Sequence, residues 1–151
     1  RTLKETLKTE RVCKAAVARS GWEIEHVPPP LVNEELAITA VKRSSCLQVI
    51  PAIALSDSVI LEAVKRDGEM LEHVPLGRRT KTVCAEAVKQ CGHAIQFVPE
   101  HLLSYEICFE AVKQNGDWVS FVPLHHQKEE IFLEAVQQNG VALRFVPAKF
   151  K

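Results

Sequence analysis

The chain has 151 residues, of which 46% are hydrophobic and 25% are charged, and its formal net charge is zero. This composition is typical of a globular protein with a core of its own and excludes an intrinsically disordered chain. The balance of 19 basic and 19 acidic residues removes any overall electrostatic attraction to nucleic acid or anionic membranes, and no run of about 18–20 apolar residues predicts a membrane-spanning helix.

A motif of about 24 residues recurs six times along the chain. Its clearest copy reads Glu-Ala-Val-Lys-Gln-Asn-Gly over residues 110–116 and closes with Val-Pro at 122–123. Successive Ala-Val pairs lie 23 or 24 residues apart, which is typical of stacked structural repeats. The pairs begin at Ala16, Ala40, Ala63, Ala87, Ala111 and Ala135. The expected repeats span roughly 9–31, 32–54, 55–78, 79–102, 103–126 and 127–150.

Each copy is expected to open with an α-helix of about 11 residues. Seven positions before the alanine, five copies carry a residue whose side chain can accept a hydrogen bond from the first helical turn. These N-cap candidates are Thr9, Asn33, Ser56, Thr80 and Ser104, and Lys128 holds the position in the last copy. The apolar positions cover about 200° of a helical wheel, which is wider than a surface helix needs. Neighbouring repeats must therefore cover the helix on several sides, and the small alanine marks a close approach of another backbone.

The glycine five positions after the alanine predicts the end of this helix, in a left-handed C-cap conformation. The second copy has Ser44-Ser45 there, so its helix is expected to end differently. Apolar residues three and six positions past the glycine predict a second helix of about six residues, which the following proline stops. A short β-strand, for example over residues 96–99, is the alternative for this segment.

The predicted fold class is all-α: an α-solenoid-like array of six helical hairpins, each with one longer and one short helix, forming a single domain over residues 1–151. We expect the chain to be a monomer. Because it begins at Arg1 rather than Met, we interpret it as a fragment of a longer protein.

The unit E-A-V-K-Q-N-G-x-x-(L/V)-x-F-V-P, found over 110–123 and with Gln137 in place of lysine over 134–147, resembles a short tandem helical repeat family of unknown function. That family occurs in large, mostly bacterial proteins. The resemblance is strong over residues 56–147 and weak in the first two copies, which lack the glutamate. It implies helical repeats within a large multidomain protein and, by association, a secreted bacterial effector. It brings no catalytic motif and implies no reaction.

The sequence contains five cysteines, an odd number whose spacing fits no zinc site. Cys13, Cys84 and Cys108 precede the repeat alanine by three positions, where they are expected to behave as small hydrophobic residues. Unpaired thiols favour a reducing compartment, such as the cytoplasm or, for a secreted effector, the host cell.

The histidines also point away from a metal site. His26 and His73 occupy the phase at which other copies carry phenylalanine, and we predict that they are part-buried substitutes for it. His126 and Glu130 can lie one helical turn apart, but two ligands are too few for a structural zinc site. With no phosphate-binding loop or hydrolase motif, we predict no catalysis, no metal and no cofactor.

A polar stripe two and three positions past the alanines best fits a binding surface. Its cations are Arg19, Lys42, Arg43, Lys65, Arg66, Lys89 and Lys113. Such a stripe is either a solvated helix face or a surface that docks an acidic protein segment. The leading interpretation is a non-catalytic scaffold or protein-interaction module without a membrane-embedded part. The alternatives are an accessory domain of an enzyme and a nucleic-acid-binding array at the basic end of the stripe. The cluster Arg78-Arg79-Thr80-Lys81 supports the latter only weakly, because it has no interleaved aromatic residues.

Overall fold

The computed structural model of this protein describes the backbone of residues 3–150 and the side chains of residues 9–150. Throughout that range the regular structure is helical, and no strand is formed. None of the helices in this part of the chain has the length and apolar character needed to cross a bilayer. The chain forms two compact units, unit 1 over residues 1–66 and unit 2 over residues 67–151.

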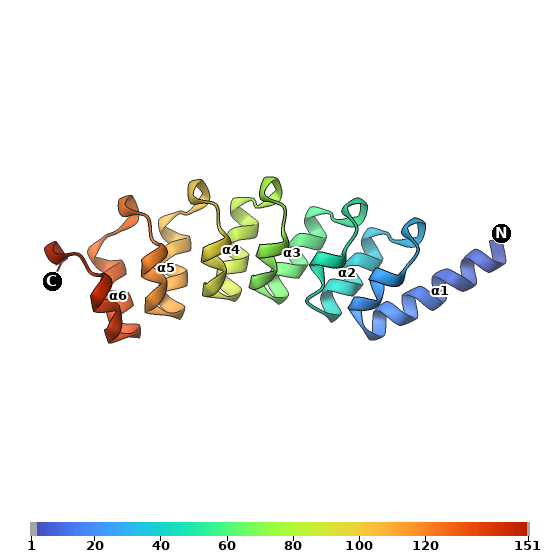
Figure 1. Ribbon diagram of the computed structural model, residues 1–151, viewed down its shortest axis with the longest axis horizontal. Coiled ribbons are helices and arrows are strands. Elements are labelled where there is room, and N and C mark those ends of the chain that lie inside the picture. The colour runs from blue at the N-terminus through green and yellow to red at the C-terminus, as the bar shows by residue number, and fades with distance from the viewer. Residues whose placement is uncertain (1–2, 151) are drawn as a thin grey trace. The chain divides into compact units, whose positions relative to one another are not determined.

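Unit 1 contains three α-helices, of which α1 packs on α2 and α2 packs on α3 (Figure 1). They are α1 (Leu3–Arg19), α2 (Glu34–Arg43) and α3 (Asp57–Arg66). Short 3₁₀-helices connect them: η1 (Gly21–His26), η2 (Pro29–Leu31), η3 (Leu47–Val49) and η4 (Ala52–Ala54).

Unit 2 contains three more α-helices, which pack side by side in chain order (Figure 1). They are α4 (Lys81–Gln90), α5 (Tyr105–Gln114) and α6 (Glu129–Gln138). The 3₁₀-helices of this unit alternate between six and three residues: η5 (Gly68–His73), η6 (Leu76–Arg78), η7 (Gly92–Phe97), η8 (Glu100–Leu102), η9 (Gly116–Phe121), η10 (Leu124–His126), η11 (Gly140–Phe145) and η12 (Ala148–Phe150).

The predicted all-α, solenoid-like repeat is confirmed, with two refinements. The second helix of each copy is a 3₁₀-helix, because its hydrogen bonds close over three residues; the Val98 N–H, for example, donates to the Ile95 carbonyl at 3.1 Å. The segment between the second helix and the next α-helix also forms a 3₁₀ turn directly after the proline, closed by the Leu102 N–H on the Pro99 carbonyl at 2.8 Å. Proline accepts this bond without needing an N–H of its own.

The positions that form the core recur with the period of the sequence. The repeat alanines from Ala40 to Ala135 are at most 2% exposed, and the following valines Val64, Val88 and Val112 are fully buried. Each such valine contributes about 1.5–3 kcal/mol relative to an exposed one. The alanine position is small because the next backbone lies directly against it.

The helix starts agree with the sequence in four copies. Side-chain oxygens of Asn33, Ser56, Thr80 and Ser104 accept the backbone N–H three residues ahead, at 2.9, 3.3, 3.3 and 3.4 Å. The prediction for Thr9 is wrong, because α1 begins at Leu3 and Thr9 lies inside it. α6 begins at Glu129, and its N-cap residue Lys128 makes no side-chain capping bond.

The predicted left-handed C-cap is wrong, since no described glycine has a positive φ. The glycine instead begins the 3₁₀-helix, at a point where the next copy leaves no room for a side chain. A Cβ on Gly116 would lie 2.1 Å from the Ala135 carbonyl oxygen, and one on Gly21 would lie 2.1 Å from that of Ala40. The second copy also departs from its prediction. α2 ends at Arg43, three residues past its alanine like the other helices, and the residue that this copy lacks is missing from η3, which has three residues instead of six.

Candidate interaction surface

The basic end of the polar stripe lies in unit 1. Arg19 ends α1, Lys42 and Arg43 end α2, and Lys65 and Arg66 end α3, and all five side chains are exposed. Cations are favourable there because the C-terminus of a helix carries a partial negative charge. α1 contacts α2 and α2 contacts α3, so the stripe crosses the ends of three neighbouring helices.

Two of these five cations are engaged within the unit. The Lys42 ammonium lies 3.5 Å from the Glu62 carboxylate, and Arg66 Nη1 donates to the Lys42 carbonyl at 2.7 Å. Arg19, Arg43 and Lys65 form no ion pair with any residue of the described chain. We call these three residues the free cation set.

The glutamates directly before the alanines pair differently from copy to copy. Glu110 pairs with Lys113 three residues on, at 4.0 Å. Glu62 instead pairs with a lysine of the preceding copy. Lys89 and Lys113 are exposed, and they are the only stripe cations in unit 2.

In unit 2 the neutral end of the stripe joins successive copies. Gln114 Oε1 accepts the Gly92 N–H at 2.6 Å, and its Nε2 donates to the Val88 carbonyl at 2.7 Å. Gln90 likewise accepts the Gly68 N–H at 2.5 Å. One amide thus satisfies a donor and an acceptor where the α-helix of the preceding copy ends and its 3₁₀-helix begins. These glutamines hold successive copies together.

Arg79, in the cluster considered as an extension of the stripe, also has a structural position. Its guanidinium donates to the carbonyls of Val74 at 2.9 Å, Glu72 at 3.1 Å and Phe97 at 2.6 Å. Gln127 makes one hydrogen bond of this kind: its Nε2 donates to the Val122 carbonyl at 3.0 Å. Both residues stand directly before the N-cap position, and both satisfy the carbonyl of a Val-Pro pair. The sequence carried a signal for this structural role. Arg79 and Gln127 have long polar side chains at a position where other copies carry Val32, Leu55 or Leu103.

The histidines are either exposed or hydrogen-bonded to neighbouring residues. His26 and His73 are exposed, so the prediction that they are part-buried is wrong. The His126 ring nitrogen Nε2 lies 2.8 Å from the Leu103 carbonyl and therefore donates its hydrogen to that oxygen. Among the described residues no three metal-ligating side chains converge.

All five cysteines are unpaired. Cys46, Cys84 and Cys108 are completely buried, and we call them the buried thiols. Burial raises the pKa of each of them to about 11, because the thiolate loses its hydration. A nucleophilic cysteine needs the opposite shift. The predicted hydrophobic role is confirmed for Cys84 and Cys108, whereas Cys13 is half-exposed.

An aromatic cluster on the 3₁₀-helices of unit 2 was not predicted from the sequence. The His93 ring lies 5.0 Å from the Trp118 ring, which in turn lies 5.9 Å from Phe121. His93 Nδ1 also lies 2.9 Å from the Glu69 carboxylate. The three rings come from η7 and η9 and occupy different phases of the repeat, so the period alone does not indicate that they meet. Glu69, in η5, shares the phase of His93.

Comparisons with known proteins agree with the repeat. No match was found among curated proteins or among solved structures. The model of a family described as "Domain of unknown function (DUF4116)" matches residues 57–103, 80–127 and 106–151, each match spanning about two copies of the repeat. Together the matches cover residues 57–151, which is more than half of the chain. The chain therefore belongs to the DUF4116 family, a family of tandem helical repeats whose function is unknown.

Proposed function

We propose that this chain is a non-catalytic helical-repeat scaffold, and that it binds an acidic segment of a partner protein through the free cation set of unit 1. The observation that carries the proposal is that Arg19, Arg43 and Lys65 come from three neighbouring helices and have no acidic partner in the described chain. Repeat architectures commonly present such extended surfaces to a partner.

The spacing of the helices defines the partner further. Neighbouring packed helices lie about 8–10 Å apart. A polyproline II segment rises about 3.1 Å per residue and has three residues per turn, so every third side chain returns to the same side after about 9 Å. The matching ligand is therefore an extended acidic segment with a carboxylate at every third position.

Each exposed ion pair contributes about 0.2–1 kcal/mol and is screened by salt. Three such pairs together change affinity by roughly tenfold. We therefore expect weak binding that decreases as ionic strength rises, and little binding by a peptide with a single carboxylate.

The test is fluorescence anisotropy with a labelled peptide of repeating Glu-Pro-Pro, compared with a Lys-Pro-Pro peptide. The Arg19→Gln, Arg43→Gln, Lys65→Gln triple variant should bind the acidic peptide about tenfold more weakly. A matched triple variant of exposed unit 2 lysines should bind like the wild type: Lys81→Gln, Lys128→Gln and Lys149→Gln. Equal affinities for both triple variants, or affinity that does not change with salt, would refute the proposal.

The five stripe cations in unit 1 also favour a second candidate, a nucleic-acid-binding array. Lys42 and Arg66 are already engaged there, which weighs against it because fewer cations remain to contact phosphates. A duplex DNA and a single-stranded RNA in the same assay separate the two candidates. Tighter binding of either nucleic acid than of the acidic peptide, lost in the first triple variant, would replace the proposed partner.

A further inference from the structure

The residue directly before the N-cap of a repeat α-helix differs between α4 and α5. Before α4 it is Arg79. Its guanidinium donates to the carbonyls of Glu72, Val74 and Phe97. Before α5 the residue at the same position is Leu103. A leucine side chain donates no hydrogen bond, so the three equivalent carbonyls one repeat later receive no guanidinium.

Those three carbonyls belong to Gln96, Val98 and Phe121. No hydrogen bond reaches them from the residues that the structure describes. Gln96 cannot form the usual 3₁₀ bond, because the residue three positions ahead is Pro99, which has no N–H. Backbone carbonyls in folded proteins almost always have a partner. Water or a donor from outside the chain must therefore supply the missing hydrogen bonds.

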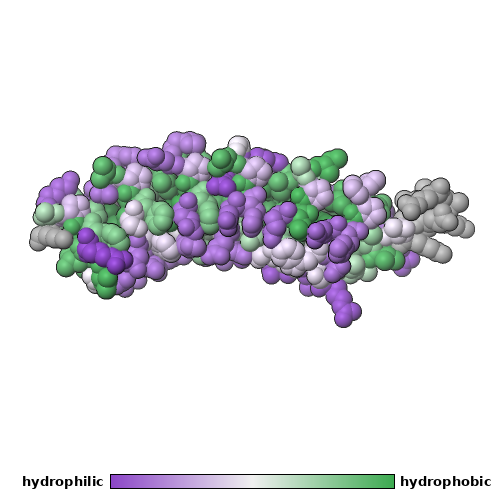
Figure 2. All heavy atoms as spheres, in the orientation of Figure 1, coloured by the Kyte–Doolittle hydropathy of each residue, from purple (hydrophilic) through white to green (hydrophobic). Residues whose placement is uncertain are grey.

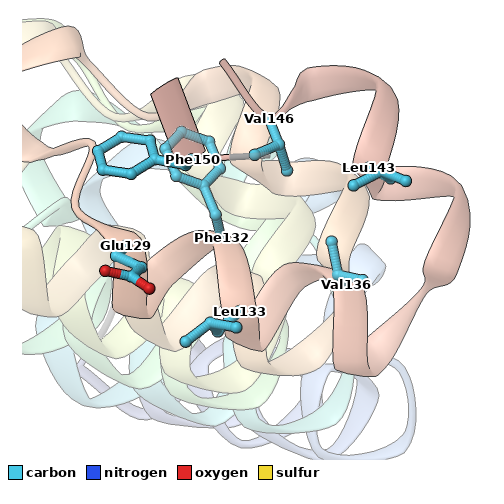
Figure 3. A pocket seen from close by; sticks show the side chains of 7 residues that line it. All are labelled: Glu129, Phe132, Leu133, Val136, Leu143, Val146 and Phe150. Carbon is cyan, nitrogen blue, oxygen red and sulfur yellow. The ribbon is translucent and has the colours of Figure 1, made fainter. Parts of the chain in front are cut away.

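An open pocket of about 470 Å³ lies at this place, and we call it the Leu103 pocket. Two of its walls, Leu103 and Phe121, are the equivalents of Arg79 and Phe97 one repeat earlier. The remaining lining residues are Glu100, Ser120, Val122, Pro123, Leu124 and His125. By contrast, a pocket of about 140 Å³ formed by α6 and the segments after it has apolar walls with Glu129 beside them (Figure 3). The Leu103 pocket offers several polar groups and therefore suits a polar ligand.

Most of the polar groups of the Leu103 pocket are acceptors, which favours a cation. Glu100 is exposed, and its carboxylate forms no ion pair within the described chain. Ser120 Oγ donates its hydrogen to the Asp117 carbonyl at 2.9 Å, so its lone pairs remain available. Phe121 is 42% exposed, and a guanidinium stacks well on an aromatic ring. A planar cationic donor thus matches the carboxylate, the carbonyls and the ring together.

We propose that the Leu103 pocket binds an arginine side chain of a partner protein, whose guanidinium takes the place that Arg79 fills one repeat earlier. Apolar side chains reach the surface of the structure at several points (Figure 2). Leu124, which lines this pocket, is 84% exposed. An apolar residue next to the arginine would cover it, so the ligand is an arginine flanked by apolar residues. The pocket lies wholly within unit 2 and shares no residue with the free cation set, so the inference does not rest on the proposed function.

A titration of ¹⁵N-labelled protein with the peptide acetyl-Leu-Arg-Leu-amide, followed by NMR, tests this inference. The measurement is made at about pH 7.5, where an ordinary histidine is mostly neutral. The amide signals of Glu100, Phe121 and Leu124 should shift and saturate, with a dissociation constant on the order of a millimolar, because one side chain fills an open pocket. Citrulline in place of arginine keeps the shape without the charge and should bind several-fold more weakly. Lysine should do the same, because one ammonium cannot reproduce the guanidinium fork.

Variants of the pocket identify the occupied site. Leu103→Arg should fill the pocket with its own guanidinium, as Arg79 does, and abolish the shifts. It should also melt at a higher temperature than Leu103→Lys, because only the guanidinium can reach several carbonyls. Glu100→Lys changes an exposed side chain and should weaken binding several-fold by reversing the charge. Gln137→Arg adds the same charge as Leu103→Arg at an exposed position outside the pocket, and it should bind like the wild type.

Several results would overturn the inference. The wild type may not bind the arginine peptide less tightly than, or equally with, the citrulline peptide. Leu103→Arg may not keep wild-type affinity or melt at the same temperature as Leu103→Lys. If Leu103→Arg does not fold, Glu100→Lys decides the question, and unchanged affinity in that variant refutes the assigned site.

Discussion

The contact between the glycine of one copy and the alanine of the next makes a matched pair of substitutions informative. Gly116 and Gly140 both follow an asparagine and both begin a six-residue 3₁₀-helix. They differ in that α6 lies against Gly116, whereas nothing in the described chain lies against Gly140. Replacing each with alanine therefore compares the same local change with and without the contact between copies.

Gly116→Ala would place its Cβ 2.1 Å from the Ala135 carbonyl oxygen and 2.9 Å from its carbonyl carbon, well inside the ~3.5 Å optimum of a non-bonded contact. Both atoms belong to backbone inside a helix, so α6 has to move. Overpacking of this kind costs about 1–3 kcal/mol. Gly140→Ala should instead gain about 0.4–1 kcal/mol, because alanine restricts the unfolded chain at a position whose φ it accepts. The stabilities of the two variants should differ by about 2 kcal/mol or more.

Urea unfolding at micromolar protein concentration measures this difference. Repeat arrays need not unfold in one step, so a probe near the contact is needed. Trp118 lies in η9, two residues past Gly116, and a Trp22→Phe background makes it the only tryptophan. Its fluorescence transition should move to lower urea in Gly116→Ala and to equal or slightly higher urea in Gly140→Ala. If Gly116→Ala proves as stable as Gly140→Ala, the close approach between copies does not exist as described.

Three further predictions concern the core and the hydrogen bonds between successive copies. Gln114→Ala should lower the free energy of unfolding by about 1–3 kcal/mol, because it leaves the Gly92 N–H without a partner; urea unfolding checks this, with the exposed Gln137→Ala expected within about 0.5 kcal/mol of wild type. Arg79→Lys should lower the melting temperature by several degrees, because one ammonium cannot reproduce a guanidinium that reaches three carbonyls; calorimetry showing no change would contradict this. The buried thiols have folded pKa values of about 11 against a reference of 9.0, so the stability they contribute is fully present below pH 9 and is lost as pH rises toward 11. Urea titrations across that range should show the loss, and serine at all three positions should remove it.

Much of the fold could be predicted from the sequence because the structure of each repeat depends largely on residues that are close together in the sequence. The 24-residue period, the side-chain caps such as Asn33 and Ser104, and the apolar arc of each helix all depend on residues within one turn or two. These signals are repeated in each copy, so an ambiguity in one copy is resolved by the others. Thr9 shows the limit of this reasoning: a good cap residue does not start a helix when the preceding residues can extend it.

The prediction of a left-handed C-cap was wrong because the deciding contact comes from another copy. Asn-Gly after a helix suits a left-handed C-cap, but the same glycine also suits a place where the Ala135 backbone leaves no room for a Cβ. Only the packing distinguishes the two. An i, i+3 apolar spacing likewise fits both α- and 3₁₀-helices, and the Val-Pro boundary with its tight turn decides for the latter. The aromatic cluster around His93 could not be predicted from the period because its rings occupy different phases of the repeat.

The hydrogen bonds between successive copies also limit which side chains of this chain can bind a partner. The residue three past the alanine reaches back to the preceding copy whether it is Arg66, Gln90 or Gln114, and in the second copy Ser44, one position later, bonds Gly21. A side chain there must be long or hydroxylated to satisfy backbone groups that would otherwise remain unpaired. The side chain two positions past the alanine is not needed for these hydrogen bonds. Lys65 and Lys89 at this position are exposed and unpaired within the described chain. Recognition can therefore change from copy to copy at that position without weakening the contact between copies, whereas a charge change at Arg66, Gln90 or Gln114 would disturb that contact before it changed a partner.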